Sequence, residues 1–477
     1  MSVTELINDQ TESLAEEATV TTTIAEQIGH WAAGVTLEAV PETVVERALL
    51  HILDCIGIAY ASSSFDFAKR ALAAVAELGS GDTPVIGHTI LLTPRDAALL
   101  NGLLVHGLDY DDTHLPGVVH ASASALPTAL AVASDRHLPG KELLLGFLIG
   151  VEVSGRIGAA ANSGLHARGF HPTGVVGAFG SAVAAARMGG LNAAGIASAQ
   201  GFVGSLASGS LEFLATGAST KRVHPGWAAV SGITAAAFAK HGFESPPEIY
   251  EGRYGMYALH TPPAHDIDLS KATAALGESW ELLRTGIKPY PTCHFTHAFA
   301  DAALILLTDQ DIKIGDIDSV TCLVPEEIVP VVLEPAESKL HPRSDYDAKF
   351  SLPFIVSAIL NRGRFTLAEL EDDSLRDEAI LNLAAKVRYE LDPNKTFPKY
   401  FHGEVIIRMN DGQEYRHRED DNRGSEQRPL SRLDIETKYF DNMALATNRS
   451  NADRIHHAVM NLVAEADSAN FAEALRA

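Results

Sequence analysis

The sequence of 477 residues contains few cysteines, and their scarcity excludes several kinds of site. The three that are present, Cys55, Cys293 and Cys322, stand far apart in the chain. They are too few and too scattered for a disulfide framework or a four-cysteine zinc site, and they cannot supply the clustered thiolates that usually hold an iron-sulfur centre. We therefore expect a reducing, cytoplasmic location and no iron-sulfur cofactor.

Basic surface and targeting signals are lacking as well. The formal net charge of −24 argues against nucleic acid or an anionic membrane as a partner, because both attract a basic face. The first twenty residues are polar and acidic, so they do not resemble a signal peptide. No run of about 20 apolar residues is free of charge and proline, and we predict no membrane-spanning helix.

Nucleotide-binding motifs are also missing. The sequence has no Walker A motif. Gly174, Gly177 and Gly180 lack both the preceding strand and the GxGxxG spacing of a dinucleotide-binding fold. We predict no cofactor and no resident metal.

Low aromatic content, at 7%, and abundant alanine favour closely packed helices over a β-sandwich. A chain of this length exceeds the usual limit of roughly 250 to 300 residues for one core, so we expect at least two folding units. Helix-start signals dominate as far as residue 284. Thr93-Pro94 opens one helix, while His171-Pro172 and His224-Pro225 each open a helix with a histidine at its start.

The pattern changes in residues 285–428, which we predict to form a small α+β unit. Residues 319–324 read as a strand, and residues 405–409 and 413–418 flank a turn that indicates a hairpin. Helical runs lie between these strands. The charge-rich segment 419–428 is expected to be a solvated linker that leads into further helical sequence.

The densest polar cluster runs from His106 to His114 and continues to His120. It holds Asp109, Asp111 and Asp112, three carboxylates that repel one another at this spacing. A solvated helix end, a divalent-metal site and a site of general acid/base catalysis all fit this pattern.

Histidines and basic residues elsewhere offer further candidates. His171 and His224 stand at helix starts, where each serves either as a helix cap or as a base, acid or substrate anchor. Lys221 and Arg222 form a basic patch in a very acidic chain, either an exposed loop or a carboxylate site. Lys288 lies near the expected domain boundary, where ligand clefts are common.

Several motifs occur in the order found in one known family: Leu108 to Thr113 with His120, Phe170 to Gly174, Lys221 to His224 with Gly226, Tyr254-Gly255, Lys288 to His294, and Asp347 to Ser351. Together they resemble the MmgE/PrpD family, which contains 2-methylcitrate dehydratases, cis-aconitate decarboxylases and iminodisuccinate epimerases. The ordered set is specific, although each motif alone is weak.

The resemblance implies a mainly α protein. Its large all-α domain would comprise residues 22–284, completed by C-terminal helices in 429–470, and its α+β lid domain would comprise 285–428. It also implies a homodimer that acts on a small polycarboxylic acid. By similarity, the active site would be lined by Asp109, Thr113, His120, His171 and Lys221.

The three family reactions begin beside a carboxylate, where negative charge builds up and cationic groups stabilise it. We assign Lys221 and Lys288 to substrate carboxylates, with Arg222 as a weaker candidate, and expect His171 or His120 to move the proton. The remaining assignments follow the same logic: Asp109 orients a histidine, Thr113 donates a hydrogen bond, and His224 and His294 contact the substrate.

Dehydration of 2-methylcitrate is our main expectation from the sequence, because it is a common activity among proteins of this kind. Decarboxylation of cis-aconitate and epimerisation of iminodisuccinate are the alternatives within the family. A metal-dependent helical prenyl-diphosphate lyase is a rival, since residues 109–112 superficially resemble an aspartate-rich motif, although the sequence shows no second one. A non-enzymatic helical scaffold is the last alternative.

Overall fold

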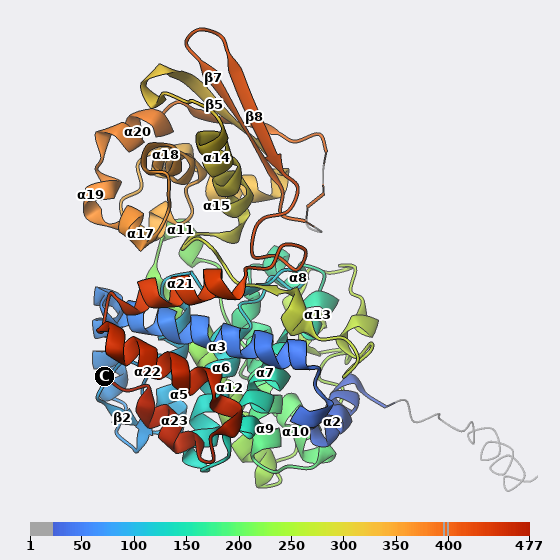
Figure 1. Ribbon diagram of the computed structural model, residues 1–477. Coiled ribbons are helices and arrows are strands. Elements are labelled where there is room, and N and C mark those ends of the chain that lie inside the picture. Colours follow the sequence, from blue (N-terminus) through green and yellow to red (C-terminus); the bar gives the residue numbers. More distant parts are fainter. Residues whose placement is uncertain (1–21, 395, 398–399) are drawn as a thin grey trace, which may run out of the picture.

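The computed structural model describes residues 22–477 except 395 and 398–399, so our reading of the first twenty residues lies outside it. Figure 1 shows two lobes, a larger one made of helices and a smaller one that carries a sheet. The larger lobe combines the N-terminal half of the chain with its C-terminal helices, drawn in blue to green and in red. The protein is therefore mainly α, as predicted.

The longer helices of the larger lobe are α2 (Ile24–Gly34), α3 (Glu42–Ser63), α4 (Asp66–Ala76), α5 (Pro94–His106), α6 (Ser122–Asp135), α7 (Gly140–Ala160), α9 (Pro172–Met188), α10 (Ala193–Val203), α12 (His224–Lys240), α21 (Arg432–Met443), α22 (Arg449–Met460) and α23 (Ser468–Ala474). Its short elements are α8 (Gly164–Arg168), α11 (Phe213–Thr216), α13 (Met256–His260), β1 (Thr83–Pro84), β2 (Leu91–Leu92), β3 (Thr113–His114) and β4 (Thr285–Gly286). Thr93 caps α5 as predicted, by accepting a hydrogen bond from the backbone of Asp96.

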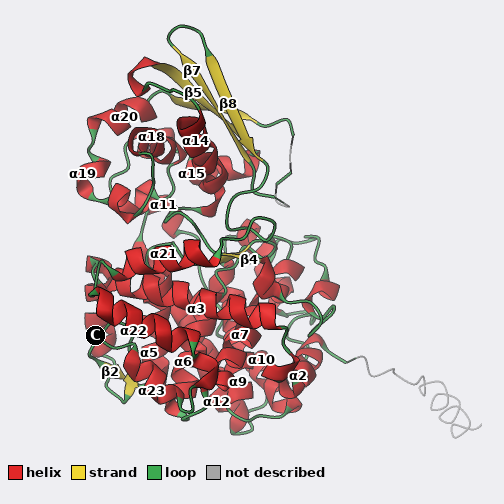
Figure 2. Ribbon diagram, in the orientation of Figure 1, coloured by secondary structure: helices red, strands yellow, loops and turns green. Residues whose placement is uncertain are grey.

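The smaller lobe contains α14 (His297–Asp309), α15 (Val329–Val332), α16 (Ala336–Leu340), α17 (Asp345–Ala348), α18 (Leu352–Arg362), α19 (Asp372–Leu375), α20 (Glu378–Ala384), β5 (Ile317–Val324), β6 (Val387–Leu391), β7 (Gly403–Met409) and β8 (Glu414–Glu419). The strands have the order β6-β5-β7-β8, with β5 parallel to β6 and antiparallel to β7. The predicted hairpin is β7 and β8, and α14 packs against both strands (Figure 2).

Helix α7 is apolar and long enough to span a membrane, yet the whole of its apolar stretch is buried inside the protein. Helices α6 and α9 pack against it. Its composition therefore reflects a central position in the core of the larger lobe.

A second hydrophobic core fills the smaller lobe and reaches across to the larger one. It joins Val320 and Phe354 of the smaller lobe to Ile58, Leu108 and Phe213 of the larger lobe. The two lobes are thus packed against each other through apolar contacts, directly beside residues 109–114.

The segment 419–428 is only in part the solvated linker that we expected, since Asp420 and residues 426–428 are exposed but its middle is not. Asn422 and Ser425 are 0% and 2% exposed, and Arg423 pairs with Asp301 of α14 at 2.9 Å. Charged side chains of this segment have partners in both lobes, since Glu426 also lies 3.6 Å from Arg284 of the larger lobe.

Helices α5 and α12 cross so closely that only glycine fits at Gly226. A Cβ atom added there would lie 2.2 Å from the carbonyl oxygen of Leu99. We expect Gly226→Ala to lower the free energy of unfolding by about 1 to 3 kcal/mol, because α12 must shift to relieve the overlap. The midpoint of thermal unfolding, followed by circular dichroism, measures this.

The matched control for this substitution is Gly34→Ala in α2, where an added Cβ atom meets nothing within 4 Å. Its unfolding midpoint should be no lower than that of the wild type, because alanine favours a helix more than glycine does. Equal midpoints for both variants would show that the crossing of α5 and α12 tolerates a side chain.

Candidate active site

A cavity lies where the two lobes meet. Most residues that the sequence predicts for the site line it: Asp109, Thr113, His120, His171, Lys221, Lys288 and His294. Apart from His166, its remaining wall is mostly apolar and comes from both lobes, with Phe213 and Leu214 on one side and Val331, Phe350 and Phe401 on the other. One region of the cavity is therefore polar and charged, and the rest is hydrophobic.

Two lysines meet at a single carboxylate in the polar region. The ammonium groups of Lys221 and Lys288 lie 2.9 and 3.0 Å from the same oxygen, Oδ1 of Asp109, and all three residues are buried. Burial alone would raise the pKa of Asp109, but the two ammonium groups hold it well below its usual range. Two ammonium groups beside one carboxylate oxygen suit this region to the binding of an anion.

Asp109 occupies an unusual backbone position just beyond the end of α5. Its φ angle is +52°, in the left-handed region that aspartate tolerates better than most side chains. Its second oxygen, Oδ2, is buried and accepts no hydrogen bond from the described residues. The backbone therefore presents this carboxylate to the cavity with one oxygen still unpaired.

The neighbouring carboxylates are paired with histidines. Nδ1 of His106 lies 2.7 Å from Asp111, and Nδ1 of His51 lies 2.6 Å from Asp112. Both acids and both histidines are buried, which excludes a solvated helix end. Burial raises the pKa of Asp111 to about 6, while hydrogen bonds from His51 and Ser122 outweigh burial and lower that of Asp112.

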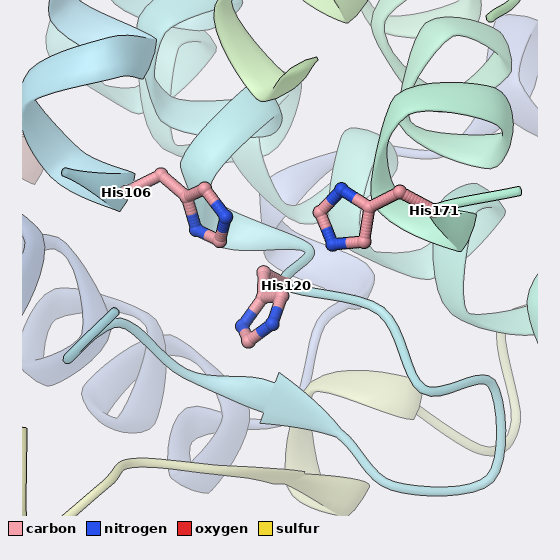
Figure 3. Close-up of side chains that lie close together, drawn as sticks. All are labelled: His106, His120 and His171. Atoms are coloured by element: carbon pink, nitrogen blue, oxygen red, sulfur yellow. The ribbon is translucent and has the colours of Figure 1, made fainter. Parts of the chain in front are cut away.

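Three imidazoles from different elements, those of His106, His120 and His171, lie close together (Figure 3), and the last two line the cavity. The ring centroid of His106 lies 4.7 Å from that of His120 and 5.6 Å from that of His171. Burial lowers the pKa of His120 to about 3, and that of His106 and His171 well below the usual value. All three rings are therefore uncharged at neutral pH.

These three histidines form a candidate metal-binding group, because one nitrogen from each lies within 4.8 Å of the others. Around a tetrahedral zinc ion with bonds of about 2.1 Å, the ligand nitrogens lie roughly 3.4 Å apart. Any two of these histidine nitrogens that are farther apart would have to move closer together to bind the ion. The nearby positive charge of Lys221 also opposes a cation. The arrangement fits a proton-transfer site better than a metal site.

Acid should destabilise this protein through its buried histidines. Burial lowers the pKa of His120, His224 and His294 to about 3, 4 and 3, from roughly 6.5 in an unfolded chain. At pH values between the folded and the unfolded pKa, the unfolded state binds more protons than the folded state. The free energy of unfolding therefore decreases as the pH falls below about 6.5.

Buried acids act in the opposite direction over part of this range. Burial raises the pKa of Asp54 and Asp111 to about 6, so the folded state binds more protons between roughly pH 3.9 and 6. More buried histidines than buried acids are shifted, and we expect a lower thermal midpoint at pH 5 than at pH 7.5. Circular dichroism melts at both values test this, and an equal or higher midpoint at pH 5 would contradict it.

Arg222 and His224 lie behind the cavity lining. The guanidinium of Arg222 donates to the carbonyl of Gly107 at 2.7 Å and to Asp345 of α17 at 3.3 Å. Arg222 is therefore better placed to link the two lobes than to bind a substrate. His224 contacts His171 instead of the cavity, with the two Nδ1 atoms 3.0 Å apart.

Some residues of the site were not predicted from the sequence. Asn422 donates a hydrogen bond to Nε2 of His294 at 2.8 Å, from a segment that we expected to be solvated. Lys349 is fully buried, donates to the carbonyls of Leu108 and Pro291, and has its pKa lowered by burial to about 7. The motif Asp347 to Ser351, which contains Lys349, was the only indication in the sequence that Lys349 belongs near the site.

Comparisons with known proteins agree with this picture. The model of the MmgE/PrpD N-terminal domain matches residues 26–266, and that of the MmgE/PrpD C-terminal domain matches residues 290–463. The human cis-aconitate decarboxylase is 28% identical over 446 residues, which cover 90% of this chain and 89% of that protein. The mouse cis-aconitate decarboxylase is 28% identical over 426 residues, covering 85% and 84%.

A more distant match is the cis-aconitate decarboxylase of Aspergillus terreus, 27% identical over 293 residues, or 58% of this chain and 59% of that protein. The helical fold, the charged cavity and these relatives together define an enzyme of the lyase class. The chain belongs to the MmgE/PrpD family, as its ordered motifs indicated.

Proposed function

We propose that this lyase decarboxylates cis-aconitate, or a close unsaturated polycarboxylate, without a cofactor. The observation that carries the proposal is the convergence of Lys221 and Lys288 on one oxygen of Asp109 in a buried cavity. The two ammonium groups attract an anion locally although the protein as a whole has a net charge of −24.

Decarboxylation, our alternative from the sequence, is now favoured over dehydration of 2-methylcitrate. The human, mouse and Aspergillus terreus relatives reported above are all named cis-aconitate decarboxylase. The prenyl-diphosphate alternative loses support because both family models that match the chain describe MmgE/PrpD domains.

The residues suit the chemistry of this reaction. The bond to the departing carboxylate breaks, CO₂ leaves, and the electron pair moves through the double bond to the carbon beside another carboxylate. Lys221 and Lys288 bind the carboxylates that share this charge, and a proton from His171 or His120 then forms the new C–H bond. A trianion and one proton thus give a dianion and CO₂.

The smaller lobe is proposed to act as a lid in this reaction. Phe350 and Phe401 of this lobe face the same cavity as Lys221 and His171 of the larger lobe. Apolar side chains above a charged site exclude water and strengthen the electrostatic interactions inside it. The homodimer and the cytoplasmic location stay predictions.

The test is to incubate the purified protein with cis-aconitate, 2-methylcitrate and iminodisuccinate in parallel. We expect CO₂ and a methylidene dicarboxylate from cis-aconitate. Gas release measures the CO₂, and NMR identifies the dicarboxylate. Water loss from 2-methylcitrate without CO₂ release would favour dehydration, and racemisation of iminodisuccinate would favour epimerisation. Absence of all three reactions would overturn the proposed substrate class.

A further inference from the structure

His171 and His224 form a pair in which only one ring faces the cavity. His171 precedes α9, lines the cavity and is 4% exposed, whereas His224 begins α12 and is half-buried behind it. Their Nδ1 atoms lie 3.0 Å apart, so one ring donates a hydrogen and the other accepts it. Because Nδ1 of His171 is engaged, its Nε2 is the nitrogen left for a ligand.

The proposed reaction makes a particular demand on His171. It consumes one proton per turnover, so a buried donor must become charged when the substrate is bound. A buried imidazolium is costly unless a partner accepts its second hydrogen.

The groups around His171 differ in their ability to meet this demand. Lys221 is a cation and opposes a second positive charge nearby. His106 is held by Asp111, and Nδ1 of His120 lies 2.8 Å from the carbonyl oxygen of Asp112. His224 alone among these neighbours already contacts Nδ1 of His171 and is also reachable by water.

We propose that His224 is a positioning residue, which accepts the Nδ1 hydrogen of His171 when a polycarboxylate binds and so stabilises the imidazolium that delivers the proton. This inference rests on the proposed function. The N–H bond at Nε2 of His171 breaks as the C–H bond of the product forms, and the imidazolium becomes neutral. Water restores the proton after the product leaves.

A neutral partner suits this role better than a carboxylate does. Burial and the charge of Lys221 lower the pKa of His224 to about 4, so His224 is itself uncharged at neutral pH. His171 therefore stays neutral without substrate. It becomes charged only when the negative charge of a bound substrate stabilises the imidazolium. Before the substrate binds, the neutral ring of His171 therefore adds no charge that Lys221 and Lys288 would repel.

Kinetics of three variants test the role of His224. Loss of a hydrogen bond to a charged group predicts that His224→Ala lowers kcat about 10- to 100-fold, with a smaller change in KM. The loss of activity at alkaline pH should also begin at a lower pH than in the wild type, because the imidazolium of His171 becomes less stable. His224→Asn, which offers an amide oxygen as acceptor, should keep most of the activity.

His224→Asp should move the alkaline limb of the pH profile in the opposite direction, to higher pH, because a carboxylate favours the imidazolium. His241→Ala, at an exposed histidine just after α12, is the matched control and should behave like the wild type. Wild-type kcat and an unshifted profile in both the alanine and aspartate variants would overturn the role of His224. If His224→Ala fails to fold, the pH profiles of His224→Asn and His224→Asp are compared instead. Identical profiles of these two variants would overturn the role of His224.

A binding experiment separates this inference from the proposed function. Isothermal titration with trans-aconitate, in two buffers of different ionisation enthalpy at pH 7.5, measures proton uptake without turnover. We expect the wild type and His241→Ala to take up a proton on binding, and His224→Ala to take up much less. Absence of trans-aconitate binding to the wild type would count against the proposed substrate class, whereas equal uptake by all variants would count against His224 alone.

Discussion

Lys221→Ala is expected to lower the turnover of cis-aconitate by about 100- to 1,000-fold while leaving the fold intact. The loss reflects removal of one of two buried cations that face the developing negative charge, a contribution similar to that of an oxyanion-hole donor. The fold should survive because Asp109 keeps its second partner, Lys288, at 3.0 Å. Steady-state kinetics and circular dichroism melts of the same preparation measure both effects.

Two further variants sharpen this experiment. Lys69→Ala removes an exposed lysine of α4 and should leave turnover unchanged, which controls for the change in net charge. Lys221→Arg keeps the charge but replaces a compact ammonium with a planar fork, so we expect partial activity. Full activity of Lys221→Ala would remove Lys221 from the site.

Asp109→Asn should damage both stability and activity. With the carboxylate gone, two ammonium groups within 3.0 Å of one atom face each other without a counter-charge. Breaking a buried ion pair in this way costs about 3 to 5 kcal/mol, and the thermal midpoint should fall accordingly. Because asparagine also tolerates the positive φ of this position, the loss can be attributed to charge and not to the backbone.

A double variant distinguishes the two effects. Asp109→Asn combined with Lys288→Met removes one of the opposed cations and should recover part of the lost thermal midpoint. Turnover should stay at least about 100-fold below that of the wild type, because a cation that stabilises the transition state is also gone. Additive losses of stability in the double variant would show that Asp109 and Lys288 do not interact.

The helix starts were predictable from the sequence because their signals are local. The cap at Thr93 and the prolines after His171 and His224 act on backbone groups within one turn, and all three helices begin within a residue or two of the expected place. The hairpin of β7 and β8 was predictable for the same reason, since its turn chemistry lies between its strands.

The pairing of site residues was not predictable, because it depends on contacts between distant parts of the chain. The acidic run between Asp109 and Asp112 left three interpretations open, and only burial beside His51, His106 and Lys221 distinguishes them. The burial of Asn422 was missed because a charge-rich sequence gives no indication of which partners it meets across a lobe boundary.

Lys438 of α21 shows how late in the chain the larger lobe is completed. Its buried ammonium lies 2.8 Å from Asp54 of α3 and donates to the carbonyl of Tyr110, 328 positions earlier in the sequence. During synthesis, the loop that presents Asp109 lacks this support until residues 432–443 have left the ribosome. The face of α3 against which α21 packs therefore stays uncovered until the C-terminal helices have been made, and the loop that carries Asp109 reaches its final arrangement only near the end of synthesis.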